Sequence, residues 1–264
     1  MSDRYALIGN PVAHSKSPAI HAEFARATGQ DVEYGLIEAR LDGLAEAVEQ
    51  FRDDGGKGLN VTLPFKEQAF ALSGQASERA RAAQAVNTLR FEDGFGDNTD
   101  GIGLIRDLRD NMGVRLRGKA LLLLGAGGAA QGVVGALLEA GAARVSIANR
   151  TVARAEALAA RFPGVRASGY DALRGERFDI VLNATSAGLA DEAPQLPEGL
   201  LGRETLAYDM VYGRDTPFLR AAREAGARAS DGLGMLVEQA AESFFVWRGV
   251  RPATRAVLGK LRGA

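Results

Sequence analysis

Four polar clusters in the first hundred residues carry side chains that could do chemistry. They are residues 14–18 (HSKSP), 60–66 (NVTLPFK), 86–88 (VNT) and 98–101 (NTDG). Each lies where a predicted strand gives way to a turn or a helix, so a parallel sheet would bring them together along one edge. Together they offer hydroxyls, an amide, a carboxylate and one ammonium group. This set suits a small polyhydroxylated acid as the ligand.

A second candidate site begins in the middle of the chain, where the apolar run 121–124 leads into Gly125, Ala126, Gly127, Gly128, Ala129 and Ala130. The first glycine permits a tight strand-to-helix turn, and Gly127 lets backbone N–H groups approach a pyrophosphate. Apolar residues then recur at helical spacing from Ala130 to Leu138, and Gly141 is a suitable helix end. The N-terminus of that helix would point N–H groups at phosphates. The pattern predicts a dinucleotide site at residues 125–129.

The residues after the next predicted strand, 144–148, indicate which dinucleotide binds. An NAD site usually has Asp or Glu there to bind the ribose 2′-OH. This chain has Asn149, Arg150 and Thr151, with Arg154 one turn later and no carboxylate before Glu156. Guanidinium and hydroxyl groups suit a 2′-phosphate, so the sequence favours NADP(H) over NAD. The alternative is a solvated basic loop without a ligand.

Composition excludes several classes of function. The net charge of −1 argues against nucleic acid or an anionic membrane as the main partner. No apolar run is long enough to span a membrane and the N-terminus lacks a signal-peptide pattern, so we expect a cytoplasmic protein. The absence of cysteine excludes disulfides and thiolate chemistry, and with only His14 and His21 we expect no metal site.

The alternation of predicted elements indicates an α/β fold with two domains. Residues 1–100 are predicted to form an α/β substrate domain with a mostly parallel sheet, completed by C-terminal helices at about 236–264. Its predicted strands are 5–8, 32–37, 57–61 and 86–91, and its helices run from Ser17 to Gly29 and over 41–51. A helix over 101–112 should bridge to a Rossmann-type NADP-binding domain at 101–235. There we expect strands at 179–182 and 206–211, before a buried helix at 235–247.

In their order along the chain, the motifs resemble those of the shikimate dehydrogenase family. The matches are GNPxxHSKSP at 9–18, NVTxPFK at 60–66, AVNT at 85–88, NTDG at 98–101, GAGGA at 125–129, NRT at 149–151, NATS at 183–186 and DGLGMLVxQA at 231–240. The resemblance covers nearly the whole chain. It implies reversible reduction of 3-dehydroshikimate to shikimate by NADPH. One departure is Gln84, where the family usually has glycine.

The resemblance assigns the central chemical role to Lys66 and Asp100. Pro64 suits the first turn of a helix, which would place Lys66 near the positive end of the helix dipole and ease loss of its proton. A partly desolvated lysine can then serve as the acid or base at the C3 oxygen. Asp100 would steer the ammonium group or share the proton. Each residue also has a simpler interpretation: an isolated Lys66 would be a solvated surface group, and Asp100 could only cap the helix that starts at Gly101.

The remaining assignments also follow from the resemblance. Ser15 and Ser17 would contact the substrate carboxylate, although Ser17 before Pro18 could instead cap a helix, and Thr62 and Asn87 would bind ring hydroxyls. The family adds Tyr212 and Gln239 on the substrate, Met210 and Gly232 near the nicotinamide, and Glu78 near the cofactor. His14 is expected to be structural.

Three alternatives to the shikimate assignment stay open. They are a quinate or dual quinate/shikimate dehydrogenase, an aminoshikimate dehydrogenase paralogue, and a non-catalytic NADP-binding sensor. The first often prefers NAD and keeps a carboxylate after the second strand, and the last would not need a proton-transfer pair. A homodimer is compatible with the sequence, which leaves the oligomeric state open.

Overall fold

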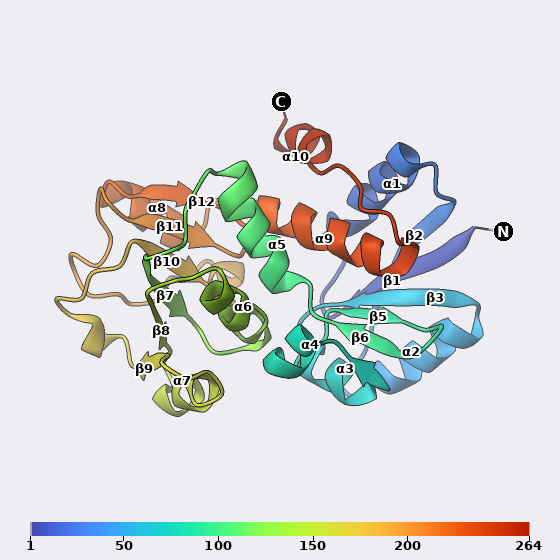
Figure 1. The fold of residues 1–264 in the computed structure, drawn as a ribbon, viewed down its shortest axis with the longest axis horizontal. Coiled ribbons are helices and arrows are strands. Elements are labelled where there is room, and N and C mark those ends of the chain that lie inside the picture. Colours follow the sequence, from blue (N-terminus) through green and yellow to red (C-terminus); the bar gives the residue numbers. More distant parts are fainter. Residues whose placement is uncertain (1, 264) are drawn as a thin grey trace. The chain divides into compact units, whose positions relative to one another are not determined.

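The computed structural model describes residues 2–263, which form two units, each built on a six-stranded sheet. Unit 1 comprises the chain up to Leu104 together with the chain from Leu236, and unit 2 comprises Ile105–Met235. The chain leaves unit 1 within helix α5 (Asp100–Arg106) and returns within helix α9 (Leu233–Arg248) (Figure 1).

The sheet of unit 1 has the strand order β2-β1-β3-β5-β6-β4. Its strands are β1 (Asp3–Gly9), β2 (Val32–Glu38), β3 (Gly56–Val61), β4 (Gln75–Ala76), β5 (Thr88–Arg90) and β6 (Phe95–Asp97). Its other helices are α1 (Ser17–Thr28), α2 (Leu44–Asp53), α3 (Lys66–Leu72), α4 (Glu78–Ala83) and α10 (Arg255–Arg262). Helix α2 begins three residues later than predicted from the sequence, because Gly43 takes the N-cap position.

The sheet of unit 1 is not parallel throughout. Strand β1 pairs in parallel with β2 and β3, and β4 pairs in parallel with β6. Strand β5, however, is antiparallel to both β3 and β6. Only residues 91–94 separate β5 from β6, and so short a connection can join only antiparallel strands. The sheet is thus mostly parallel, as predicted, and β5 is the exception.

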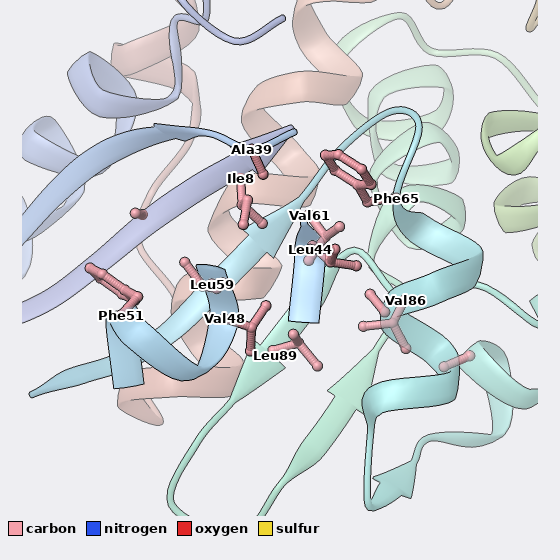
Figure 2. Close-up of a cluster of buried hydrophobic side chains, with 13 residues drawn as sticks. Ile8, Ala39, Leu44, Val48, Phe51, Leu59, Val61, Phe65, Val86 and Leu89 are labelled. Carbon is pink, nitrogen blue, oxygen red and sulfur yellow. The ribbon is translucent and has the colours of Figure 1, made fainter. Parts of the chain in front are cut away.

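One face of this sheet packs on α2, α3 and α4 through apolar side chains (Figure 2). Ile8, Leu59 and Val61 come from the strands, and Leu44 and Val48 come from α2. Each such side chain, when fully buried, stabilises the fold by about 1.5–3 kcal/mol. Gln84, which ends α4, adopts the left-handed conformation at φ 48°, where the family's usual glycine would be less strained.

The opposite face of the same sheet carries aromatic and polar side chains. The fully buried His21 of α1 stacks on Tyr34 of β2 with ring centroids 4.1 Å apart. Phe244 and Trp247 of α9 complete the aromatic cluster around that imidazole. Because strand residues alternate between faces, β3 and β5 supply the apolar core on one side and polar groups on this side.

Unit 2 is a doubly wound α/β unit whose strand pairs are all parallel. Its strand order is β12-β11-β10-β7-β8-β9, so the order reverses between β7 and β10. Its strands are β7 (Ala120–Leu124), β8 (Arg144–Ala148), β9 (Arg166–Ser168), β10 (Ile180–Asn183), β11 (Leu206–Asp209) and β12 (Arg228–Ser230). Its helices are α6 (Gly128–Glu139), α7 (Val152–Ala159) and α8 (Pro217–Glu224), with short 3₁₀ turns η2 (Asp171–Leu173) and η3 (Ala187–Ala190).

The helix predicted over 101–112 is divided. Helix α5 ends at Arg106 and continues as a π-helical turn, η1 (Asp107–Asn111). The buried carboxylate of Asp107 accepts hydrogen bonds from the Tyr208 hydroxyl at 2.7 Å and from Asn111 Nδ2 at 2.9 Å. Burial is the largest cause that raises the pKa of Tyr208 well above its usual value, so its hydroxyl stays a donor.

Among residues 2–263, no helix combines the length and apolar character that crossing a bilayer requires.

Burial of His21 makes the stability of unit 1 depend on pH. Desolvation lowers the pKa of His21 to about 3, whereas an unfolded histidine has a pKa of about 6.5. Between these values the unfolded chain binds the additional proton, so stability is lost as the pH falls through this range. We expect His21 to contribute a slope of up to about 1.4 kcal/mol per pH unit.

The measurement is urea unfolding of the wild-type protein and of His21→Phe at several pH values between about 6 and 4. The substitution keeps an aromatic ring but removes the titrating group, so its free energy of unfolding should fall less steeply toward acid. Equal slopes for the two proteins would show that His21 does not titrate on unfolding.

Candidate active site

Lys66 and Asp100 form an ion pair in unit 1. Lys66 Nζ lies 2.5 Å from Asp100 Oδ2, and the two side chains are 15% and 7% exposed. Lys66 is the first residue of α3, and its neighbour Phe65 is fully buried in the apolar core and takes the N-cap position. The sequence suggested that Pro64 lies in the first turn of this helix, but in the structure Pro64 precedes the helix.

The carboxylate of Asp100 does not act only as a helix cap. Its Oδ2 pairs with Lys66, and its Oδ1 accepts a hydrogen bond of 2.9 Å from Asn87 Nδ2. Asp100 is itself the first residue of α5, and its backbone N–H donates to Asn98 Oδ1 at 3.2 Å. Both carboxylate oxygens are thus directed at the predicted catalytic and substrate-binding residues.

Strand direction explains why these residues meet. Lys66 follows the carboxyl end of β3, whereas Asn87 precedes β5 and Asp100 follows β6. Because β5 is antiparallel to β3 and β6, its amino end lies at the same sheet edge as their carboxyl ends. The predicted meeting of the polar clusters at one edge is therefore observed, although it arises from a mixed sheet and not from a parallel one.

Gln239 contacts the polar group around Asn87, whereas the hydroxyls of Ser15 and Ser17 contact each other. Gln239 of α9 accepts hydrogen bonds at Oε1 from Asn87 Nδ2 at 3.4 Å and from Thr99 Oγ1 at 3.3 Å. Ser15 and Ser17 follow β1, and their hydroxyls lie 3.1 Å apart. Lys16 takes the N-cap position of α1, so Ser17 is not the cap that its place before Pro18 suggested. The half-buried Thr62 directly follows β3.

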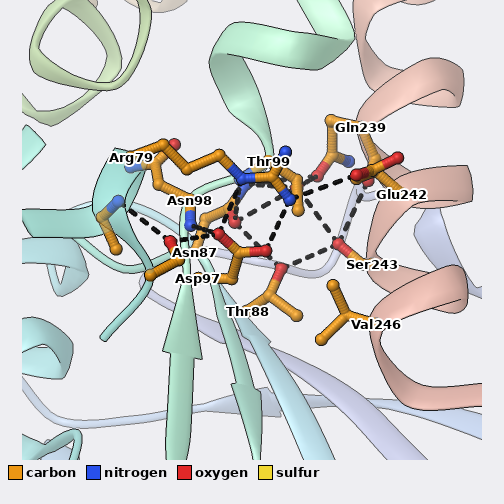
Figure 3. A network of polar contacts seen from close by, with 12 residues as sticks. Arg79, Asn87, Thr88, Asp97, Asn98, Thr99, Gln239, Glu242, Ser243 and Val246 are labelled. Atoms are coloured by element: carbon orange, nitrogen blue, oxygen red, sulfur yellow. Dashed lines mark hydrogen bonds and ion pairs between the residues drawn. The ribbon is translucent and has the colours of Figure 1, made fainter. Parts of the chain in front are cut away.

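A partly buried charge cluster supports the loop that carries Asp100, and the sequence motifs did not predict it. Arg79 Nε and Nη2 of α4 donate to the two carboxylate oxygens of Asp97 at 2.7 and 2.5 Å. Arg79 Nη2 also lies 3.2 Å from Glu242 Oε1 of α9 (Figure 3). Burial is the largest single influence on the pKa of Asp97 and raises it. The hydrogen bonds and charge of Arg79, together with the hydrogen bonds from Ser77 and the Asn98 backbone N–H, outweigh burial and leave the pKa below its usual value. These residues are up to 163 positions apart, so no local motif could have indicated their contact.

Gly125 and Gly127 in unit 2 meet different structural demands. Gly125 has φ 103°, and its N–H donates to the Ala148 carbonyl at 2.8 Å. A Cβ at Gly125 would lie 3.2 Å from the backbone of Ala184, whereas one at Gly127 would meet no atom within 4 Å. Gly127 is the N-cap of α6, where no side chain caps the helix and no acidic residue lies in the first turn. The turn thus has open space beside Ala126, Gly128 and Ala129. The positive end of the α6 helix dipole would attract an anionic group there.

The loop after β8 carries the predicted cofactor-selecting residues. Asn149 Nδ2 donates to the Thr151 carbonyl at 2.8 Å, which folds the loop back toward α7. Arg150, Thr151 and Arg154 are exposed, and within residues 2–263 no carboxylate forms an ion pair with either arginine. These cations are thus available to a phosphate group.

Met210 and Gly232 lie against each other in unit 2. Gly232 N–H donates to the Val211 carbonyl at 3.1 Å, and a Cβ at Gly232 would lie 2.5 Å from the Met210 carbonyl oxygen. The loop that begins at Met210 and contains the half-buried Tyr212 is held by Asp209. Its carboxylate accepts from Val211 N at 3.0 Å and from the Thr216 hydroxyl at 2.6 Å, and burial raises its pKa.

The predicted site residues divide between the two units. Glu78, with an exposed side chain at the start of α4, belongs to unit 1, whereas the other predicted cofactor residues belong to unit 2. Tyr212 belongs to unit 2, whereas the other predicted substrate residues belong to unit 1. In the described part of the chain, no three His, Cys, Asp or Glu side chains are grouped so that they could hold a metal ion.

Comparison with known proteins gives consistent matches along the chain. Three family models match: shikimate dehydrogenase substrate binding domain over residues 7–89, shikimate / quinate 5-dehydrogenase over 107–190, and shikimate 5'-dehydrogenase C-terminal domain over 232–262. The shikimate dehydrogenase (NADP(+)) of Methylobacillus flagellatus is 57% identical, covering 99% of this chain and 100% of that protein.

Two solved structures share the fold. The Ael1 enzyme from Pseudomonas putida has a TM-score of 0.92 at 55% identity, covering 98% of each chain. The shikimate 5-dehydrogenase of Thermus thermophilus, in complex with NADP(H) and shikimate, has a TM-score of 0.89 at 38% identity, covering 99% of each chain.

The two glycines offer a matched pair of substitutions. Gly125→Ala should lower the free energy of unfolding by about 1–3 kcal/mol, because alanine is strained at this φ and its Cβ is crowded. Gly127→Ala should cost less than about 1 kcal/mol, because its Cβ enters open space. Chemical denaturation of both variants tests this difference, which would be contradicted by equal losses.

Proposed function

Since the chain belongs to the shikimate dehydrogenase family, we propose that it reversibly reduces 3-dehydroshikimate to shikimate with NADPH, using Lys66 and Asp100 for proton transfer. The observation that carries this proposal is the 2.5 Å contact between Lys66 Nζ and Asp100 Oδ2 in a largely buried environment. Removing two charges from water costs about as much free energy as their attraction returns, so the pair adds little stability. A role in proton transfer explains why the chain keeps it, whereas a protein that only binds NADP would not need it.

The chemistry requires a hydride and a proton at one carbonyl group. NADPH, held by the residues of unit 2, would supply the hydride. Lys66 donates a proton from Nζ to the carbonyl oxygen as it becomes the C3 hydroxyl, and in the reverse direction it removes that proton. Asp100 stabilises the ammonium form of Lys66 before transfer and holds Nζ in place. Asn87 fixes the carboxylate of Asp100 through its hydrogen bond to Oδ1.

The residues of unit 2 suit NADPH. The open space at Gly127 and the uncapped N-terminus of α6 suit the pyrophosphate. Arg150, Thr151 and Arg154 suit the 2′-phosphate, since guanidinium groups make charge-assisted bonds to phosphate oxygens. Met210 and Gly232 would lie near the nicotinamide. The exposed Glu78 is also proposed to contact the cofactor.

The polar groups at the sheet edge of unit 1 suit a hydroxylated carboxylic acid. Ser15 and Ser17 would bind its carboxylate, and Thr62, Asn87, Gln239 and Tyr212 would bind ring hydroxyls. Quinate remains a second candidate substrate, because one matching family model is described as shikimate / quinate 5-dehydrogenase. The absence of a carboxylate after β8 favours the NADP-dependent shikimate reaction over an NAD-dependent one.

The proposal extends to the protein's setting. We expect it to act in the cytoplasm, which accords with a chain that has no cysteine. Lys66, Asn87 and Asp100 all come from one chain, so the proton-transfer group does not require a homodimer.

Removal of the ammonium group should abolish most of the chemistry. We expect Lys66→Ala to lower kcat by roughly 10²-fold or more with a much smaller change in KM, because the lysine transfers the proton in the transition state. NADPH consumption is followed with 3-dehydroshikimate, and controls without substrate and with quinate and NADP⁺ separate the candidate functions. Lys119→Ala, which removes an exposed lysine paired with Asp179 in unit 2, is the matched control. Turnover of Lys66→Ala near the wild-type rate would remove Lys66 from this role.

The loop after β8 should determine which nucleotide is used. We expect Arg150→Ala and Arg154→Ala to raise KM for NADPH by roughly 10- to 100-fold, because each loses a charge-assisted contact with the 2′-phosphate. KM for NADH should change less than about twofold, since NADH lacks that phosphate. An equal effect on both nucleotides would mean that these arginines do not read the 2′ position.

A further inference from the structure

A continuous series of four hydrogen bonds leads through unit 1 to the Asp100 carboxylate. The Tyr34 hydroxyl donates to Asn60 Oδ1 at 2.8 Å, and Asn60 Nδ2 donates to Thr88 Oγ1 at 3.1 Å. The Thr88 hydroxyl donates to Asn87 Oδ1 at 2.9 Å, and Asn87 Nδ2 donates to Asp100 Oδ1 at 2.9 Å. Every bond in this series has its donor on the Tyr34 side and its acceptor on the Asp100 side.

The orientations of the two amides are fixed by backbone groups. Asn87 Oδ1 accepts a bond of 2.9 Å from the Thr99 backbone N–H, which can only donate. Asn60 Nδ2 lies 3.1 Å from the Asn87 carbonyl oxygen, which can only accept. Rotating either amide by half a turn would place two donors or two acceptors against each other, so the direction of the series is built into the fold.

The hydroxyl of Thr88 sets the direction at the centre of the series. Its oxygen accepts from Asn60 Nδ2, and its hydroxyl donates to Asn87 Oδ1, which has no proton to give back. Ser243 Oγ of α9 also accepts from Asn60 Nδ2 at 2.9 Å. The same oxygen lies 2.8 Å from Thr88 Oγ1, and either hydroxyl can be the donor in this pair (Figure 3). Thr88 is fully buried, so it has no surface with which to touch a substrate.

We infer that Tyr34 and Thr88 are positioning residues, which act through Asn60 and Asn87 to hold the Asp100 carboxylate in place for proton transfer by Lys66. The inference rests on the proposed function. In a buried environment, hydrogen bonds that point the same way polarise and strengthen one another. The last donor, Asn87 Nδ2, therefore holds Oδ1 firmly and leaves Oδ2 for the ammonium group.

The direct test removes only the hydroxyl at the centre of the series. Thr88→Val keeps the shape of the side chain and should lower kcat for NADPH-dependent reduction of 3-dehydroshikimate by roughly five- to tenfold. Thr88→Ser restores the hydroxyl and should recover most of that loss. Thr205→Val is the matched control, because Thr205 is also buried and its hydroxyl donates to the Phe178 carbonyl in unit 2. It should leave kcat within about twofold of the wild type.

A double-mutant cycle distinguishes positioning from general structural damage. If Thr88 acts through Asp100, Thr88→Val should reduce kcat by less than about twofold when Asp100→Asn is already present. If Thr88 only supports the fold, the same five- to tenfold factor should persist in that background, and this result would overturn the inference.

A second variant keeps the inference testable if Thr88→Val does not fold. Tyr34→Phe removes only the first donor of the series, and it should lower kcat by roughly two- to threefold in the wild type and not at all beside Asp100→Asn. Additive effects of Tyr34→Phe would also overturn the inference. An inactive wild-type protein would instead contradict the proposed function, so the two failures are distinguishable.

Discussion

The contact between Lys66 and Asp100 is the interaction on which the rest of unit 1 depends. Two opposite charges are held largely out of water, and removing charges from water is costly unless other polar groups replace the hydration. Asn87 provides that replacement at one carboxylate oxygen, and Thr99 and Thr88 in turn hold the amide of Asn87. The arrangement requires the ends of three strands and helix α9 to be present together. It therefore exists only in the folded chain.

The alternation of side chains along the strands produces both the core and the polar network. Leu59 and Leu89 point to the face covered by α2, whereas Asn60 and Thr88, one residue away in each strand, point to the face covered by α9. The apolar face anchors the strands through close packing, so the polar groups on the other face are carried by a rigid support. A shift of one residue in strand register would exchange the two faces and destroy the core and the network together.

Much of unit 2 could be predicted because its signals are local. Gly125 must adopt a positive φ beside β10, and the strand before it and the helix after it were recognisable from apolar runs and helical spacing. In unit 1, by contrast, β1, β2, β3 and β5 were located from the sequence, but the short strands β4 and β6 were not. The antiparallel direction of β5 follows from its short connection to β6, so it could not be predicted while β6 was unrecognised. The contacts of Arg79 with Asp97 and Glu242 were missed for a related reason, since partners far apart in the chain leave no spacing to recognise.

The sequence by itself determined the alternation of strands and helices, the glycine turn, the absence of an acidic residue directly after β8, and the candidacy of Lys66 and Asp100 through their motifs. Only the tertiary structure decided that these two side chains touch, that Asn87, directly before the antiparallel strand β5, binds Asp100, and that other side chains extend the network. These are Tyr34, Asn60 and Ser243. The physical reason is that backbone conformation and side-chain periodicity are set by neighbours in the chain. Hydrogen bonds between buried side chains instead depend on which segments the packed core brings within about 3 Å of each other.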